Sequence, residues 1–407
     1  MVNRFMPVSA LAVPKGLIGG PFGSSLGKRD YVASGVPVIR GQNLAGPGRF
    51  EADEFVYVSE EKASGELGRN LAKPGDVIFT QRGTLGQVGL VPDTGPDTYV
   101  ISQSQMRLRV DPAVADARYV YYCFRDSRMQ RVISSHAIVT GVPHINLGIL
   151  AELEIPYRAV EEQSAIAEVL GALDDKIEIN RRIAATSLEL AVARYRLATA
   201  SSPIMVKLGA LGRWRSGGTP TTQEPSYWNG AIPWISASSL KSFFIDRSDR
   251  NVTEEGAGAG SRLVGPGTIL FVVRGMSLKS EFRLGIAQRQ VAFGQDCKAV
   301  IVDREWPHIT VAVGLRAAEK EILLLVDEAG HGTGRLPTDL LREFEIAIPS
   351  PEPRQRVEAE LESLVARGAE AERETEILKE LRDTLLPALI SGVLRVADGE
   401  QVVGEAV

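Results

Sequence analysis

Four short segments in the first 155 residues combine arginine, glutamine, asparagine or serine side chains with glycine. They are residues 39–44, 80–84, 101–105 and 140–146. Arginine can donate two hydrogen bonds to guanine, and asparagine or glutamine can do the same with adenine, so these side chains are suited to reading base edges. Neighbouring glycines let the backbone approach a phosphate closely. The same residues are also common in plain turns, so the choice depends on the elements that hold them.

Residues for catalysis or metal binding do not form a recognisable motif. The sequence has no glycine-rich turn ending in Lys-Ser or Lys-Thr, no dinucleotide fingerprint and no Asp/Asn-Pro-Pro-aromatic tetrapeptide of amino-methyltransferases. Ser102 and Ser104 lack the Gly-x-Ser-x-Gly context of a hydrolase nucleophile. His136 and His144 are too far apart for a one-turn metal pair. We therefore predict no catalytic residue and no metal site, and we interpret the charged cluster at 60–62 as solvated surface rather than a nuclease motif.

The composition indicates the cellular compartment and limits the positive charge available for binding a polyanion. The chain carries 46 basic and 51 acidic residues, and residues 351–407 hold 7 of the former and 13 of the latter. A polyanion would therefore need a local arrangement of cations. Cys123 and Cys297 are too few for a disulfide framework or a cysteine zinc site, which predicts a reducing, cytoplasmic location. The apolar run at 263–273 is far shorter than the ~20 residues of a membrane helix, so no membrane contact is predicted.

The chain repeats itself at an offset of 191 to 196 residues. Residues 35–39 recur as 231–235, and residues 73–83 recur as 265–275. Each repeated segment contains an apolar, β-branched run bounded by turn residues, which is typical of a strand. The sequence therefore indicates a tandem duplication of one unit of just under 200 residues.

Each copy ends in about 40 residues whose apolar positions alternate at spacings of four and three, as in a coiled coil. The predicted seam positions are Ile166, Leu170, Leu173, Ile177, Asn180, Val357, Leu361, Leu364, Leu378 and Leu385. A lone helix of this length, about 60 Å, would leave its apolar stripe unburied, so we expect the two helices to pack on each other. Asn180 could set the register or face solvent, and Pro387 predicts a kink or an early end.

The predicted fold class is α+β, with two mixed α/β domains in a tandem pseudo-two-fold repeat, separated by two long helices packed as an antiparallel coiled coil. The predicted boundaries are 1–155 for the first domain, 156–203 for the central helix, 204–350 for the second domain, 351–396 for the C-terminal helix and 397–407 for a tail. Duplication predicts two similar but non-identical surfaces.

The order, duplication and spacing of these motifs resemble the specificity subunit of a Type I restriction–modification system over nearly the whole chain. The resemblance is carried by residues 35–44, 75–83, 154–163, 216–220, 227–236 and 349–351. It implies two target-recognition domains, each binding one half of a split DNA sequence, and helices that set the gap between the halves. It also implies double-stranded DNA and two methyltransferase subunits as partners. S-adenosylmethionine would be bound by the methyltransferases and ATP with Mg²⁺ by a restriction subunit, so this chain itself would bind no cofactor.

Within this resemblance, polar residues of the loops become candidates for contact with DNA. The candidates are Arg40, Gln42, Asn43, Arg82, Gln103, Gln105 and His144 in the first domain, and Ser236, Ser238, Arg274, Lys279, Gln295 and His331 in the second. The second copy has Ala237-Ser238 for Gln42-Asn43 and Val273 for Gln81, which predicts a different half-site.

Two other function classes remain open on the residues alone. A coiled-coil scaffold would bind proteins without DNA affinity, and a free-standing nuclease would cut DNA with Mg²⁺ alone. Steep salt dependence of DNA binding would separate the specificity subunit from the scaffold. The helix starts also differ, because Arg354 replaces Glu162, so the two helices need not bind a partner in the same way.

Overall fold

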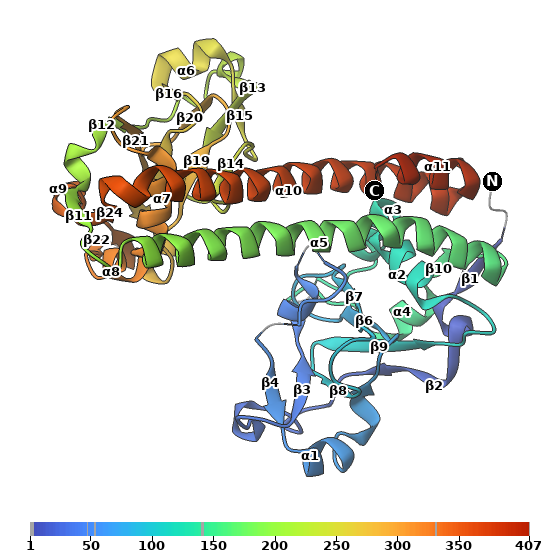
Figure 1. Ribbon diagram of the computed structural model, residues 1–407. Helices are drawn as coiled ribbons and strands as arrows, with labels where there is room; N and C mark the ends of the chain where they lie inside the picture. Colours follow the sequence, from blue (N-terminus) through green and yellow to red (C-terminus); the bar gives the residue numbers. More distant parts are fainter. Residues whose placement is uncertain (1–3, 47, 53, 140–141, 330–331, 407) are drawn as a thin grey trace. The chain divides into compact units, whose positions relative to one another are not determined.

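The computed structural model describes residues 4–46, 48–52, 54–139, 142–329 and 332–406, and it divides into two compact units (Figure 1). The first unit comprises Met1–Glu178 and Glu376–Val407, and the second comprises Ile179–Thr375. Each of the long helices α5 (Val160–Ala198) and α10 (Pro351–Ser391) belongs to both units. The start of α5 and the end of α10 lie in the first unit, and the other two ends lie in the second. The predicted mixture of sheets with two long helices is therefore confirmed.

The first unit contains two four-stranded sheets. One has the order β2-β9-β6-β7 and the other β4-β3-β8-β5, while β1 pairs with β10. Its strands are β1 (Phe5–Pro7), β2 (Ala12–Gly19), β3 (Val36–Ile39), β4 (Val56–Val58), β5 (Leu71–Ala72), β6 (Val77–Thr80), β7 (Val88–Leu90), β8 (Tyr99–Ile101), β9 (Gln105–Val110) and β10 (Glu154–Pro156). Its short helices are α1 (Glu60–Ser64), α2 (Ala117–Arg125), α3 (Ser127–Ser135) and α4 (Leu147–Glu152).

The second unit repeats this plan with β12-β21-β17-β19-β14, β15-β13-β20-β16 and the pair β11-β24, and it adds β18-β23-β22. Its strands are β11 (Ile204–Lys207), β12 (Gly212–Ser216), β13 (Trp228–Ile235), β14 (Phe244–Ile245), β15 (Asn251–Val252), β16 (Leu263–Val264), β17 (Ile269–Val272), β18 (Arg274–Gly275), β19 (Leu284–Ala287), β20 (Val291–Phe293), β21 (Cys297–Val302), β22 (Asp327–Ala329), β23 (Thr333–Arg335) and β24 (Glu345–Ile348). Its short helices are α6 (Glu254–Gly260), α7 (His308–Ala317), α8 (Glu319–Leu323) and α9 (Thr338–Glu343).

The sheets confirm the duplication, because the strand orders of the first unit recur in the second, which adds β14 and the sheet β18-β23-β22. Apolar runs such as Val77–Thr80 and Ile269–Val272 are buried along their whole length, as expected for the central strand of a sheet covered on both faces. Each lies next to the strand that begins at Gln105 or Cys297, in the same register: Phe79 pairs with Met106, and Phe271 with Lys298. The repeated sequence motifs therefore build repeated sheets.

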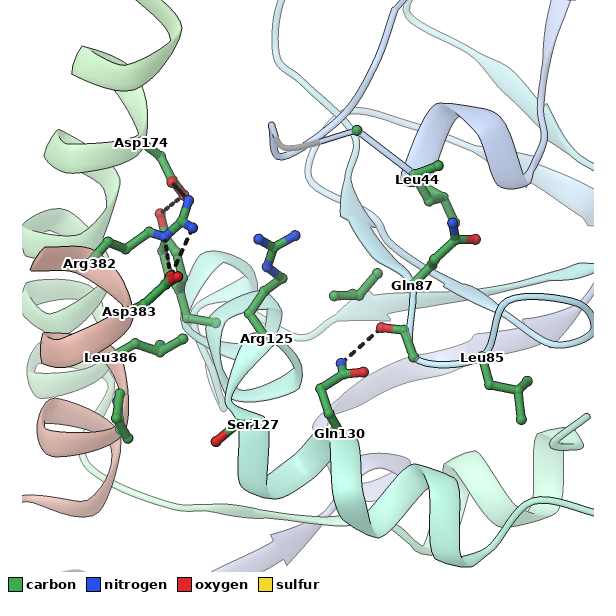
Figure 2. A pocket seen from close by; sticks show the side chains of 16 residues that line it. Leu44, Leu85, Gln87, Arg125, Ser127, Gln130, Asp174, Arg382, Asp383 and Leu386 are labelled. Atoms are coloured by element: carbon green, nitrogen blue, oxygen red, sulfur yellow. Dashed lines mark hydrogen bonds and ion pairs between the residues drawn. The ribbon is translucent and has the colours of Figure 1, made fainter. Parts of the chain in front are cut away.

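Within the first unit, the start of α5 packs against the end of α10. The predicted seam residues Ile166, Leu170, Leu173, Ile177, Leu378 and Leu385 are all buried in the core of this unit. Arg382 donates to Asp174 Oδ1 at 2.8 Å and to Asp383 (Figure 2). Tyr122 Oη donates to Asp174 Oδ2 at 2.8 Å. Burial opposes the charge of Arg382, but the two aspartates raise its pKa well above the usual value.

This ion pair borders a cavity of about 480 Å³ between α2, α10 and the loops at 44–46 and 85–88. Figure 2 shows Arg125 of α2 pointing into it. Arg125 and Arg382 balance the charges of Asp174 and Asp383, so the cavity carries no net charge.

Within the second unit, the end of α5 packs against the start of α10. Val357 and Leu361 are buried there, and Leu364 is partly buried. Asn180 is 2% exposed and its Nδ2 donates to Glu374 Oε2 at 2.7 Å, so the expectation of a solvent-facing Asn180 is wrong. The hydrogen bond links the two helices, as a register-setting polar residue would.

The C-terminal end of the chain differs from the prediction. α10 continues past Pro387 to Ser391, so the helix does not end early at the proline. Residues Val396–Ala406 form a further helix, α11, where a tail was predicted. Val403 of α11 is buried in the core of the first unit, which gives this helix its stabilising contact.

Candidate nucleic-acid interface

In the first unit, the polar segments predicted to recognise DNA meet around one turn, residues 102–105. Ser102 N donates to Ile39 O at 3.0 Å, and Gln81 N donates to Ser104 O at 2.7 Å. Ile145 N donates in turn to Gln81 O at 3.0 Å. The described parts of all four segments therefore form one surface, which we call the first loop platform; residues 140 and 141 lie outside the described residues.

Arg82 is the most available cation of this platform. Its backbone forms an isolated bridge with His144, and its side chain is exposed. The guanidinium makes no hydrogen bond or ion pair within the described part of the chain. His144 is half-buried, and its Nδ1 lies 3.2 Å from Val142 O. An exposed arginine fixed through its backbone can approach a base edge or a phosphate.

Two predicted contact residues lie inside the protein instead. Asn43 is 0% exposed; its Oδ1 accepts from Arg40 N at 2.9 Å and its Nδ2 donates to Glu51 O at 3.0 Å. Gln105 is also 0% exposed, and its Oε1 accepts from Ser102 Oγ. The Asn43 amide stabilises its turn through both of its polar atoms, whereas Gln105 accepts one hydrogen bond and its buried Nε2 has no partner among the described residues. Their burial contradicts the predicted contact with DNA, and we leave both out of the contact set.

Three further predicted residues are engaged in holding loops. Arg40 Nη2 and Gln42 Nε2 donate to Glu54 O at 3.0 and 2.8 Å. Gln103 Nε2 donates to Gly23 O at 2.6 Å and to Leu26 O at 2.7 Å. Their side chains remain at the surface, Arg40 half-buried and the two glutamines exposed.

The second unit builds the same platform from the equivalent backbone groups. Gly294 N donates to Ile235 O at 2.8 Å, Val273 N to Asp296 O at 2.9 Å, and Leu336 N to Val273 O at 2.9 Å. These three bonds match those of the first platform one for one. We call this surface the second loop platform.

The matching bonds correct the sequence correspondence. Ser236 N donates to Ser239 Oγ at 2.8 Å, as Arg40 N does to Asn43, so Ser239 and not Ser238 replaces Asn43. Ser236 and Ser238 share a hydrogen bond of 2.9 Å, with Ser238 exposed in the place of Gln42.

Arg335 was missed by the sequence analysis. It pairs with Arg274 across β18 and β23, as His144 pairs with Arg82. Leu336 lies 191 residues after Ile145, within the offsets of the repeat, and this register was the signal that could have revealed Arg335. The predicted His331 lies outside the described residues.

A cavity of about 430 Å³ opens in the second loop platform. Arg274, Gln295, Lys298 and Arg335 line it together with Asp296 and Asp339. Within the described residues, Arg274 and Arg335 have no acidic partner. Lys298 Nζ donates to Ser216 Oγ at 2.6 Å, and Lys279 is exposed nearby on the turn that packs against β23. Three cations facing two carboxylates leave this platform with an excess of positive charge.

The described residues provide neither a reactive thiol nor a metal site. Burial raises the pKa of the Cys297 thiol to about 12 and that of Cys123 above its usual range, so both thiols stay protonated at neutral pH. Among the described residues, no three His, Cys, Asp or Glu side chains are grouped closely enough to hold a metal ion. No helix in the described part of the chain has the length and hydropathy to cross a membrane.

Known proteins are similar to this chain in sequence. Residues 28–186 match the family of Type I restriction modification DNA specificity domains. The chain is 24% identical over 404 residues to the Type I restriction enzyme MjaIX specificity subunit of Methanocaldococcus jannaschii, covering 91% of this chain and 89% of that protein. It is 29% identical over 157 residues to the EcoR124I/EcoR124II specificity subunit of Escherichia coli, covering 37% of this chain and 38% of that protein.

A solved structure shows the same fold. The S subunit of a Type I restriction–modification system from M. genitalium aligns with a TM-score of 0.58 at 20% identity, over 95% of this chain and 96% of the other. The matched family domain, the relative that aligns over most of the chain and the duplicated platforms agree. Residues 28–186 of this chain thus match a Type I restriction modification DNA specificity domain, and the chain as a whole is similar to Type I specificity subunits in sequence and in fold.

Proposed function

We propose that this chain reads a two-part DNA sequence, with one half bound by each loop platform. The observation that carries the proposal is the repeated platform itself: the same three backbone hydrogen bonds present an exposed arginine at the same place, Arg82 in one unit and Arg274 in the other. The neighbouring side chains differ, because His144 stands where the second unit has Arg335. A common scaffold with different contact residues is what two unlike half-sites require.

The two platforms offer different chemistry to DNA. In the second, Arg274 and Gln295 can form paired hydrogen bonds with guanine and adenine edges. Lys298 and Arg335, on the same cavity wall, suit phosphate oxygens and would supply salt-dependent affinity. In the first, Arg82 and His144 are the corresponding contacts. We therefore expect the second platform to depend more strongly on ionic strength.

The long helices would set the spacing between half-sites and bind two methyltransferase subunits. Several apolar side chains of α5 face solvent: Ile179 is 52% exposed and Leu190 is 47% exposed. Within the second unit they line a groove with Leu364 of α10. An exposed apolar groove on a helix pair supports the binding of a partner protein.

Catalysis would belong to those partners. The methyltransferase subunits would bind S-adenosylmethionine, and a restriction subunit would bind ATP and Mg²⁺ and act on the DNA. This chain would be a non-catalytic, cytoplasmic subunit without a cofactor of its own.

The test is a map of methylated adenines in the source genome with and without this gene. We expect one gapped, two-part motif to lose its methylation on deletion. Exchanging residues 204–350 for those of another specificity subunit should change one half of the motif and keep the other. Unchanged methylation at every motif in the deletion strain, with a methyltransferase shown to be active there, would refute the proposal.

A further inference from the structure

A phenylalanine stands exposed on a loop whose ends are fixed. Phe22 is 92% exposed, more than any other large apolar side chain among the described residues. Two residues before it, Gly20 N donates to Gln105 O at 2.9 Å. A Cβ at Gly20 would lie 2.1 Å from Ser102 O, so only glycine allows this close approach. The loop is therefore pressed against the central turn of the first loop platform.

The far side of the loop is held as firmly. The Gln103 amide donates to Gly23 O and Leu26 O at 2.6 and 2.7 Å, on either side of the loop tip. Leu26 is buried and Gly23 adopts a left-handed conformation with φ of +59°, which favours glycine. The Phe22 ring is therefore exposed to solvent on a loop that is fixed by hydrogen bonds. Because the loop is already ordered, its backbone loses little conformational entropy on binding.

Cations follow the ring on the same segment. Lys28 and Arg29 are exposed, and Arg29 Nη2 donates to Ser24 O at 3.1 Å, which places its guanidinium against the loop. An exposed aromatic ring beside cations is the combination that binds the bases and phosphates of DNA. The second unit has no aromatic residue between Gly218 and Tyr227, so this stretch has no counterpart of Phe22.

We propose that Phe22 places its ring against the base stack of the half-site bound by the first unit, with Lys28 and Arg29 on the adjoining phosphates. The inference rests on the proposed DNA-binding function and deepens it. Phe22 would open or bend one base step, and the ease of deforming that step would add specificity that hydrogen bonds do not supply. Specificity in the two half-sites would then have different physical origins.

The experiment uses the full chain and a pool of DNA duplexes with a randomised centre. Duplexes enriched by the unaltered protein define the preferred sequence, and their affinities are then measured for Phe22→Ala, Phe22→Trp and the control Leu324→Ala. Leu324 is an 85% exposed apolar residue in the second unit and lies outside both platforms. We expect Phe22→Ala to lose about tenfold in affinity or more, Phe22→Trp to retain binding, and the control to match the unaltered chain.

A second readout follows the base step directly. With 2-aminopurine placed at successive positions of the first half-site, binding should raise its fluorescence at one step, and Phe22→Ala should remove that rise. Equal affinity and equal fluorescence for Phe22→Ala would overturn the inference while the proposed function stands. Failure of the unaltered chain to enrich any sequence would overturn both.

Discussion

Lys298 gives the sharpest test of how the second platform binds. It occupies the same sheet position as Met106 in the first unit, because Phe271 pairs with Lys298 as Phe79 pairs with Met106. Lys298→Met therefore removes one cation and introduces the side chain that the repeat already accommodates there. The sheet should keep its packing, so a change in DNA binding reports the charge alone.

The expected magnitude follows from counterion release. Each phosphate contact contributes about −0.9 to the slope of log affinity against log salt concentration. One lost contact should make the slope shallower by about 0.9. Between 50 mM and 200 mM salt, a fourfold change, the unaltered protein should therefore lose about 3.5-fold more affinity than the variant.

The assay is a titration of the chain against its enriched duplex at several salt concentrations. A slope for Lys298→Met equal to that of the unaltered protein would refute the assignment of Lys298 to a phosphate. A loss of affinity without a change of slope would instead indicate a contact with a base.

Three further sets of substitutions test the site and its support. Arg82→Ala and Arg274→Ala should each cost about 1–3 kcal/mol in affinity for the enriched duplex and relax one half of the preferred sequence, and titrations with either half-site mutated would show whether the two losses are independent. Arg382→Met should destabilise the first unit by about 3–5 kcal/mol because Asp174 is left buried without its cation, and adding Asp174→Asn should recover most of the loss in denaturant unfolding. Burial alone would raise the pKa of Asp116, but hydrogen bonds from Arg118 and Ser164 lower it overall, so its contribution to stability is present above the unfolded value of about 4 and is lost as pH falls through the folded pKa. Asp116→Asn should flatten the dependence of stability on pH in that acidic range, and an unchanged acid unfolding curve would contradict this reasoning.

The fold could be predicted from the sequence because its signals are local and occur twice. Runs such as 77–79 and 269–271, with turn residues before them and an arginine-glycine pair after, identify a strand and its following loop in each copy. The four-three spacing in α5 and α10 identified buried positions for the same reason.

The direction in which single polar side chains point was not predictable. Asn43 and Gln42 are neighbours in sequence with similar chemistry, yet one is 0% exposed and closes a turn while the other lies at the surface. The choice depends on which residue faces the backbone of Glu51, a contact that only the folded loop defines. Arg335 was missed because it matches a histidine, and residue identity is not kept where two sites differ in specificity.

The first unit is formed by two separate segments of the chain, and this affects how it folds during synthesis on the ribosome. Its core is closed by Leu378, Leu389 and Val403, far along the chain from the strands they cover. The second unit is continuous from Ile179 to Thr375 and can complete its fold while that closing segment is still inside the exit tunnel. The first unit, whose strands are synthesised first, therefore completes its fold after the second unit. A chain truncated before residue 378 would keep the segments of the second unit but leave the apolar core of the first unit open, a product that chaperones and proteases would recognise.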